Sequence, residues 1–521
     1  MIHRGGAVAR TTEARGRASV REFLAGLLDP GTFVPWDGPS AGDPPHGAGP
    51  ESAPEYAAEL ERAHRTSGAD EAVVCGEGRV RGLRVAVAAS EFSFLGGSIG
   101  AAAAERLTRA AERATDEGLP LIAAPASGGT RMQEGTRAFL AMAKVSAAIA
   151  EHKSAGLPYL VYLRHPTTGG VLASWGSQGH VTLAEPRALI GFLGPRAQDA
   201  ILGHRLPEGV QSAENLYRHG LVDAVVAPEA LGEEAHRLLT LMSAGGGAVP
   251  APLAEAVDEQ AGPAPAGEAW DSVTRTRRAG RPGLVGLLRH AAEEAVLLHG
   301  TGDGRADPAM TAAFARFGGT ACVLVGQDRA AQNGGSALGA GALRTARRGI
   351  RLAAELRLPL VTVIDTPGAA LSAHAEEEGI AGEIARCLAD LATLPQPTVS
   401  VLLGQGAGGA ALALLPADRV LAARHAWLSP LPFEGASGIV HRTPDRAAEV
   451  AAGMGARSAD LREAGAVDLI VDERGDAADE PEAFCRRMGA AIGHGLGSVA
   501  AEEAGVRLAR RRARFWNLGT A

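Results

Sequence analysis

The sequence predicts an α/β protein built from two copies of one unit, in which strand, glycine turn and helix follow one another twice. In the first copy, the apolar run Leu119–Ala126 ends in Ser127-Gly128-Gly129, and a segment rich in Ala, Met and Leu follows. A second apolar run, Leu157–Leu163, then leads to Gly169-Gly170. This alternation is typical of a βαβα arrangement.

The same pattern recurs in the second half of the chain. Leu119-Pro120-Leu121 returns as Leu358-Pro359-Leu360, an offset of 239 (358 − 119). Two turns held in one register over about fifty residues indicate an internal duplication. The further matching pairs are Pro158 with Pro397, Gly169-Gly170 with Gly408-Gly409, and Gly220–Val226 with Gly465–Val471.

The length of 521 residues is enough for two to four domains, and the repeat favours two large ones. The stretch between the two copies consists mainly of Gly, Ala and Pro, which cannot bury a core and predict a linker. The sequence therefore predicts an N-terminal extension over 1–60, a first domain over 61–242, a linker over 243–268 and a second domain over 269–521.

Local patterns place the shorter elements of the first half. Helices are expected over Val20–Leu28, Glu55–Arg65 and Ala101–Glu117, strands over Ala72–Val74 and Leu83–Ala88, and a loop over Gly38–Pro54. After the linker, Trp270–Gly300 is expected to be mainly helical.

Composition excludes several classes of protein. A net charge of −8 argues against general nucleic-acid binding, which requires a basic surface. No apolar run is long enough to cross a membrane and no signal-type segment opens the chain, so no membrane association and a cytoplasmic location are expected. The four cysteines contain no CxxC pair, which argues against both a zinc site and a disulfide framework; they are Cys75, Cys322, Cys387 and Cys485.

Four glycine turns at the ends of strands are the candidate functional sites. Where a strand passes into a helix, free backbone N–H groups can converge on one anion or developing oxyanion. The alternative is that glycine only allows close packing of helix on strand, but the duplication favours the oxyanion interpretation. The turns are Gly128-Gly129, Gly169-Gly170, Pro367-Gly368-Ala369 and Gly408-Gly409.

No nucleophile or acid–base set accompanies these turns. Ser127 lacks a G-x-S-x-G setting, and Asp365 is interpreted as a helix N-cap. His165, His374 and His425 have no spacing typical of a metal site. The arginine run Arg507–Arg514 is interpreted as a solvated helix end. A site without side-chain catalysts suits a reaction in which the substrate or cofactor supplies the base.

Several motifs of this chain resemble a known family. Four motifs of the first half are similar to the β subunit of the bacterial acetyl-CoA carboxylase carboxyltransferase, and four of the second half to its α subunit. The first set is SGGTRMQEG (127–135), PTTGGVLAS (166–174), AEPRALIGFLGPR (184–196) and LPEGVQSAE (206–214). The second is IDTPGA (364–369), AEEEGIAGEIAR (375–386), GQGAGGAALAL (404–414) and HAWLSPLPFEGAS (425–437).

The resemblance implies two tandem crotonase-like domains fused in one carboxyltransferase chain. The first would hold an acyl-CoA thioester, with its enolate stabilised by Gly128, Gly129, Gly169 and Gly170. The second would hold the ureido oxygen of carboxybiotin at Gly368, Ala369, Gly408 and Gly409. Further substrate-binding residues implied by the resemblance are Gly96, Gly97, Ser98, Ser127, Arg131 and Thr168.

The implied reaction carries a carboxyl group from carboxybiotin to the α-carbon of a short acyl-CoA, for instance from acetyl-CoA to malonyl-CoA, without a metal. The implied partners are biotin carboxylase, a biotin carboxyl carrier protein and a second copy of the chain, in a dimer or an assembly of dimers with shared sites. Neither Lys144 nor Lys153, the two lysines, lies in a Met-Lys-Met biotinylation sequence. We therefore expect the biotin to be carried by another chain.

The chain departs from the family on the biotin side and near its start. The four-cysteine zinc ribbon typical of bacterial β subunits is missing, and Ala370-Leu371-Ser372 and Asp328–Gly341 replace loops typical of α subunits. Two alternatives follow: a decarboxylase or atypical carboxyltransferase acting on malonyl-type thioesters, and a scaffold that binds acyl-CoA without turnover. The presence of both Gly408 and Gly409 argues against a scaffold.

Overall fold

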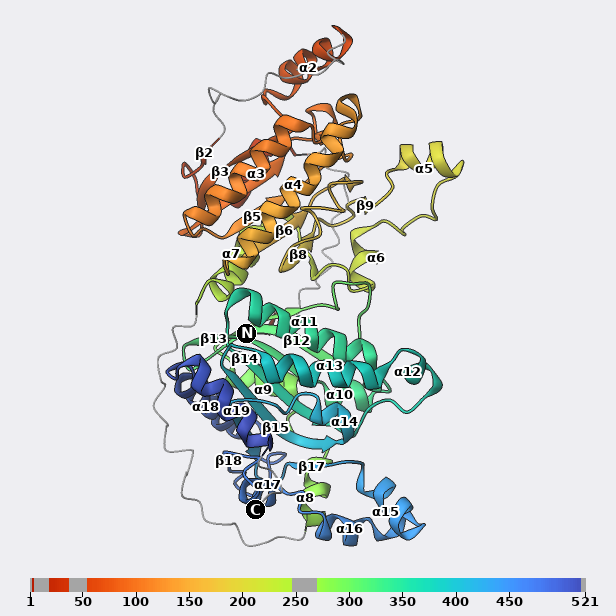
Figure 1. The fold of residues 1–521 in the computed structure, drawn as a ribbon, viewed down its shortest axis with the longest axis vertical. Coiled ribbons are helices and arrows are strands. Elements are labelled where there is room, and N and C mark those ends of the chain that lie inside the picture. Colours follow the sequence, from red (N-terminus) through yellow and green to blue (C-terminus); the bar gives the residue numbers. More distant parts are fainter. Residues whose placement is uncertain (1, 4–17, 37–53, 246–268, 517–521) are drawn as a thin grey trace. The chain divides into compact units, whose positions relative to one another are not determined.

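The computed structural model describes residues 2–3, 18–36, 54–245 and 269–516. These residues form two compact units, and the boundary between them follows Ser243. Each unit is an α/β structure with its own sheet (Figure 1), which confirms the predicted fold class. Most of the expected loop over 38–54 and of the expected linker over 243–268 lies outside the described residues.

The first unit is built on a seven-stranded sheet of order β10-β8-β6-β5-β4-β3-β2. Strands β3 and β4 form an antiparallel hairpin, and β5, β6, β8 and β10 continue from β4 in parallel. The bounds are β2 Val34–Pro35, β3 Val73–Val80, β4 Leu83–Ser90, β5 Leu121–Ala124, β6 Tyr159–Leu163, β8 Val181–Ala184 and β10 Ala224–Val225. Strands β7 (Thr167–Thr168) and β9 (Ile190–Gly191) pair separately.

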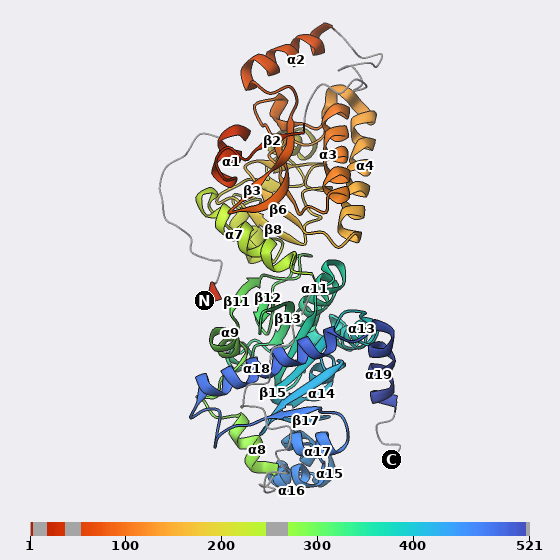
Figure 2. The same cartoon turned by 90° about the vertical axis from the view of Figure 1, so that its left-hand side faces the viewer.

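Helices cover both faces of this sheet (Figure 2). Helices α3 (Ala101–Asp116) and α4 (Gly135–Ser154) pack on each other over one face, and α1 (Val20–Leu27) packs on α7 (Pro228–Met242) over the other. Small side chains on α3, such as Ala103 and Ala111, are fully buried, so the core is filled mainly by Ala, Val and Leu. The remaining helices are α2 Pro54–Ser67, α5 Pro195–Leu202, α6 Ala213–Arg218 and the short η1 Leu95–Gly97 and η2 Met132–Glu134.

The second unit repeats this topology in a nine-stranded sheet. The hairpin β12–β13 is followed by the parallel strands β14, β15, β16 and β18, in the same order as β3 to β10 of the first unit. The bounds are β12 Met310–Phe317, β13 Thr320–Gln327, β14 Leu360–Thr366, β15 Thr398–Ala407, β16 Arg419–Ala423 and β18 Leu469–Val471. The sheet is extended by β1 Ile2–His3 and β11 Glu294–Leu298, and β17 Trp427–Ser429 pairs with the end of β15.

Helices again lie on both faces: α11 (Ala340–Leu356) and α13 (Ile380–Thr393) on one, α9 (Leu284–Ala291) and α18 (Pro481–Ala500) on the other (Figure 2). The expected helical region over 270–300 also contains β11, so that prediction holds only in part. The others are α8 Ala269–Thr276, α10 Arg329–Asn333, α12 Ala373–Glu377, α14 Gly408–Leu412, α15 Phe433–His441, η3 Pro444–Arg446, α16 Ala447–Gly453, α17 Ser458–Glu463 and α19 Ala504–Trp516.

The arginine run on α19 is not a solvated helix end, and that interpretation was wrong. Arg511 is 1% exposed, and its guanidinium donates to both carboxylate oxygens of Asp418 at 2.9 and 2.7 Å. It also donates to the carbonyls of Leu391 and Leu394 at 2.7 and 2.8 Å. The run therefore fastens α19 to the C-terminal end of α13 and to Asp418, which directly precedes β16. Sequence alone missed this because Asp418 is ninety-three residues away.

No helix in the described part of the chain is long and apolar enough to cross a membrane.

Candidate active site

In the first unit, the two glycine turns meet. Gly129 and Gly169 have positive φ angles of 114° and 66°, a backbone region that favours glycine. A Cβ added to Gly169 would lie 3.2 Å from the Cα of Gly129. A Cβ added to Gly170 would lie 2.8 Å from Oγ1 of Thr130. The close approach of these two backbones explains why the sequence has glycine at both turns.

Most N–H groups of these turns are used within the protein. Gly128 donates to the carbonyl of Gly96 at 2.9 Å, and Gly129 to Oγ of Ser127 at 3.0 Å. Gly169 donates to the carbonyl of Phe192 at 3.0 Å. These three glycines therefore shape the turns, and their own N–H groups do not point to a ligand.

At the two turns of the first unit, the N–H groups of Thr130 and Gly170 remain available among the described residues. Ile99 pairs with Thr130 through the bonds Ile99 N to Gly129 O and Arg131 N to Ile99 O, both 2.9 Å, so the N–H of Thr130 points away from Ile99. Within the described residues, neither this N–H nor that of Gly170 donates to a protein acceptor. Thr130 and Gly170 are both partly exposed. Their N–H groups can therefore serve one ligand oxygen.

The second unit repeats this arrangement at the same offset of 239. Leu338 pairs with Ala369, the counterpart of Thr130, and Gly368 donates to Oγ1 of Thr366 at 3.1 Å. Gly409, the counterpart of Gly170, is the second residue of α14, where an N–H has no acceptor within the helix. Ala369 and Gly409 are partly exposed. Each unit thus offers one pair of N–H donors: Thr130 with Gly170, and Ala369 with Gly409.

The expectation that every glycine turn opens a helix was wrong for three of the four turns. Only Gly408 begins a helix, the five-residue α14. Gly169 is followed by turns, and α4 starts only at Gly135. The N–H donors are oriented mainly by the glycine turns with positive φ and by the isolated β-bridges Ile99–Thr130 and Leu338–Ala369, and less by helix N-termini. The offset of 239 could have identified Thr130, because it aligns this residue with Ala369.

The predicted substrate-binding residues Ser127, Thr168 and Arg131 are buried in contacts within the protein. Ser127 is fully buried and its Oγ donates to the carbonyl of Gly97 at 2.5 Å. Thr168 is 3% exposed, and its N–H donates to the carbonyl of Ser127 at 2.9 Å. Both residues hold the first turn in shape. Contact of Gly96, Gly97 and Ser98 with a substrate stays a prediction.

Arg131 does not reach the surface, which corrects its assignment as a ligand contact. Its side chain is 0% exposed and forms an ion pair with the fully buried Glu71, which the sequence did not single out. Burial acts to lower the pKa of Arg131, but the hydrogen bonds and charge of Glu71 outweigh it and raise that pKa. The guanidinium also donates to the carbonyl of Ser98 at 2.9 Å. Arg131 therefore fastens the loop beside the first turn.

Asp365 is not a helix N-cap, since it lies inside β14 and is fully buried. Its Oδ1 accepts from the N–H of Gln405 on β15 at 3.0 Å. Burial raises the pKa of this carboxyl, and the charge of Arg329 opposes that rise. A Cβ on Gly404 would lie only 2.6 Å from Oδ1 of Asp365, so glycine at this position leaves room for the carboxyl. The carboxyl therefore joins the two strands that lead to Ala369 and Gly409.

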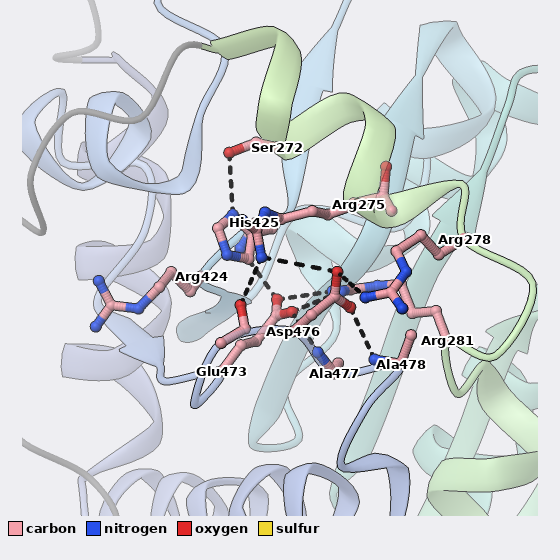
Figure 3. Close-up of polar contacts among 12 residues, drawn as sticks. Ser272, Arg275, Arg278, Arg281, Arg424, His425, Glu473, Asp476, Ala477 and Ala478 are labelled. Carbon is pink, nitrogen blue, oxygen red and sulfur yellow. Dashed lines mark hydrogen bonds and ion pairs between the residues drawn. The ribbon is translucent and has the colours of Figure 1, made fainter.

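A polar cluster fastens the segment after α8 to the strands of the second site (Figure 3). The fully buried Arg281 and Glu473 form two hydrogen bonds of 2.6 and 2.8 Å, and Arg281 also donates to the carbonyl of Leu403 on β15 at 3.1 Å. Burial acts to raise the pKa of Glu473, but Arg281 outweighs it and lowers that pKa. His425 contacts Ser272 at 3.2 Å through Nδ1, so its ring is part of this cluster.

No group of three or more His, Cys, Asp or Glu side chains that could hold a metal occurs among the described residues. The paired backbone N–H groups of the two sites can donate to an oxygen that carries or develops negative charge.

Comparison with known proteins identifies the family. Residues 12–492 match the carboxyl transferase domain family. The chain is 56% identical over 506 residues to a probable biotin-dependent acyl-coenzyme A carboxylase beta3 subunit of Mycobacterium tuberculosis (strain ATCC 25618 / H37Rv), covering 96% of this chain and 99% of that protein. It is 40% identical over 511 residues to the acetyl-coenzyme A carboxylase carboxyl transferase subunits beta/alpha of Salinispora arenicola (strain CNS-205), covering 92% of this chain and 87% of that protein.

Among solved structures, the transcarboxylase 12S, described as a hexamer with methylmalonyl-coenzyme A bound, matches with a TM-score of 0.72 at 21% identity, over 94% of this chain and 91% of that one. At this identity the match supports the fold. The chain belongs to the carboxyl transferase domain family. It is a carboxyltransferase enzyme, as the sequence motifs predicted.

Proposed function

We propose that this chain is the carboxyltransferase subunit of a biotin-dependent acyl-CoA carboxylase, and that it carboxylates the α-carbon of a short acyl-CoA such as acetyl-CoA. The observation that carries the proposal is the duplicated pair of N–H donors, Thr130 with Gly170 and Ala369 with Gly409. The reaction needs two such sites, because one carbonyl oxygen of each reactant gains negative charge.

The first pair suits the acyl-CoA. When the α-proton leaves, negative charge moves to the thioester oxygen, and two N–H donors aimed at that oxygen stabilise the enolate. Removing one donor of this kind typically costs about 2.7–4 kcal/mol of transition-state stabilisation. The neighbouring Gly129 and Gly169 have no side chain, so the thioester can approach the backbone closely.

The second pair suits the ureido oxygen of carboxybiotin, which a separate carrier protein would present. Carboxybiotin would supply the carboxyl group and, after releasing it, the base for the α-proton. The residues of this chain need only bind, orient and stabilise charge, which agrees with the absence of an acid–base side chain at the turns. The carboxyl of Asp365 is buried, which raises its pKa. It accepts a hydrogen bond from the N–H of Gln405 and thereby holds β14 against β15.

We further propose that each active site is shared between two copies of the chain, with the first unit of one copy facing the second unit of the other. Exposed apolar side chains lie beside each donor pair and support such a contact. In the first unit Phe192 is 67% exposed, and in the second Leu371 is 92% exposed. The backbone carbonyl of Phe192 accepts a hydrogen bond from the N–H of Gly169, and Leu371 lies two residues after Ala369.

The test of the reaction uses the purified chain with biotin carboxylase, biotinylated carrier protein, ATP, bicarbonate and a panel of acyl-CoA thioesters. Carboxylation of a short acyl-CoA that requires the carrier would support the proposal. Release of carbon dioxide from malonyl-CoA without carrier would support a decarboxylase instead. Tight acyl-CoA binding with no turnover on any thioester would support a scaffold.

The test of the shared site is complementation. A Gly170→Val chain and a Gly409→Val chain, each inactive alone, are mixed under conditions that exchange subunits. Shared sites predict partial recovery of activity, because one site of each mixed dimer combines two intact halves. No recovery despite demonstrated exchange, or a fully active monomer, would contradict the arrangement.

A further inference from the structure

A buried amide side chain connects the two arms of the second donor pair. Gln327, the last residue of β13, is fully buried. Its Oε1 accepts from the N–H of Asp365 at 3.0 Å, and its Nε2 donates to the carbonyl of Ala410 at 2.8 Å. Asp365 precedes the turn that ends at Ala369, and Ala410 directly follows Gly409. One side chain thus contacts the backbone next to Gly409 and the backbone four residues before Ala369.

The strand pairing is irregular where this amide acts. The register between β14 and β15 shifts between Ile364 and Thr366, which itself pairs with Gly406, so the ladder of hydrogen bonds is interrupted at Asp365. Gln332 of α10 supports the same turn from another side. It donates to the carbonyl of Asp365 at 3.2 Å and accepts from Oγ1 of Thr366 at 2.6 Å. The side chains of Gln327 and Gln332 therefore fix the backbone at the point where the strand pairing is irregular.

The first unit has no equivalent of Gln327. Ala86 of β4 pairs with Leu121 as Val323 of β13 pairs with Leu360, so the residue that matches Gln327 is Ser90, the last residue of β4. Its buried hydroxyl has no hydrogen-bond partner among the described residues. There the two arms are joined by backbone bonds, among them that from the N–H of Thr168 to the carbonyl of Ser127 at 2.9 Å. The amide connection is thus a feature of the second donor pair.

We propose that Gln327 is a positioning residue that sets the spacing between the N–H groups of Ala369 and Gly409. It touches no reacting atom and acts through the backbone. The proposal rests on the proposed function, in which this pair holds the carboxybiotin oxygen. Loss of the amide should therefore impair the use of carboxybiotin and leave acyl-CoA binding intact, since the acyl-CoA pair belongs to the other unit.

The test compares two variants of Gln327 with one control in the full-length chain. Gln327→Met keeps the approximate size and removes both hydrogen bonds. Gln327→Glu keeps an acceptor for the N–H of Asp365 but places a carboxylate oxygen against the carbonyl of Ala410. The control is Thr398→Val, which removes buried hydrogen bonds of 3.0 and 2.9 Å with Asp418 at the opposite end of β15.

Gln327→Met should lower kcat about tenfold to a hundredfold, the cost typical of donors displaced by a fraction of an ångström to an ångström. The KM for carboxylated carrier should rise, and the Kd of acyl-CoA by calorimetry should stay unchanged. Gln327→Glu should likewise lower kcat, raise the KM for carboxylated carrier and leave the Kd of acyl-CoA unchanged. It replaces Gln327→Met in the test if the Met variant does not fold. Thr398→Val should lower Tm by about as much as Gln327→Met does, but it should retain the wild-type kcat.

Amide hydrogen exchange provides a readout that does not depend on turnover. Both Gln327 variants should exchange faster over 366–370 and 408–412, with no change over 127–131. Equal losses of activity in Gln327→Met and Thr398→Val, or unchanged exchange at both arms, would overturn the positioning role. If the wild-type chain transfers no carboxyl group, the proposed function fails, and the exchange data still decide whether Gln327 holds the two arms together.

Discussion

Replacement of Gly170 by valine is the sharpest test of the first donor pair. The φ angle of Gly170 is not positive, so the backbone can accept a valine without strain. The added Cβ would lie 2.8 Å from Oγ1 of Thr130 and 3.8 Å from Cγ of Met142. Contacts of 2.8 Å are closer than real Cβ atoms allow, so the side chain of Thr130, the residue that carries the partner N–H, has to move.

The expected loss follows from the number of donors affected. Displacing one N–H of an oxyanion hole costs about 2.7–4 kcal/mol, which corresponds to about a hundredfold to a thousandfold in kcat. The two methyl groups of valine also occupy the space that a thioester oxygen would enter. Gly170→Val should therefore lower kcat by at least about a hundredfold and leave the far-ultraviolet circular dichroism spectrum unchanged.

The assay is transfer of radiolabelled carboxyl from carboxylated carrier to acyl-CoA, with thermal unfolding measured in parallel. Gly26→Ala is the control in the same unit, because a Cβ at Gly26 in α1 meets no atom within 4 Å. That variant should keep wild-type activity and gain up to about 1 kcal/mol of stability. Near-normal turnover of both Gly170→Val and Gly169→Val would remove these turns from the mechanism.

Three further predictions concern partners, pH and the arginine run. The chain alone, with ATP, bicarbonate and acyl-CoA but no carrier, should show no carboxylation, and any such activity would contradict the need for a separate biotin carrier. Burial lowers the pKa of His152 from 6.5 to about 4, so the first unit should lose up to about 3 kcal/mol of stability as pH falls from about 6.5 to about 4. Denaturant unfolding of His152→Gln should lack this pH dependence, and an identical profile would refute its origin in His152. Arg511→Met should destabilise the chain by about 3–5 kcal/mol, because it leaves Asp418 buried and incompletely paired, whereas the exposed neighbour Arg512→Met should change stability by less than about 0.5 kcal/mol. If Arg511→Met and Arg512→Met lowered the urea midpoint of unfolding equally, the stabilising role of the buried Arg511–Asp418 ion pair would be contradicted.

The sequence alone determined the duplication, the fold class and the place of the glycine turns. Apolar runs predicted β4, β5 and β6 to within about two residues, and the helical pattern predicted α3 to within one residue. The offset of 239 predicted that β14 and β15 repeat β5 and β6, which the strand order confirms. These features follow from local patterns, because periodicity and turn chemistry act between residues close in the chain.

Only the tertiary structure decided which atoms are available at each site. The sequence marked Gly128 and Gly129, but their N–H groups are taken by Gly96 and Ser127, and the free donor is that of Thr130. It assigned Arg131 to a ligand, although Glu71, sixty residues earlier, holds it in the interior. Hydrogen bonds between distant segments leave no periodic mark in a sequence, because they depend on which loops the folded sheets bring within about 3 Å of one another.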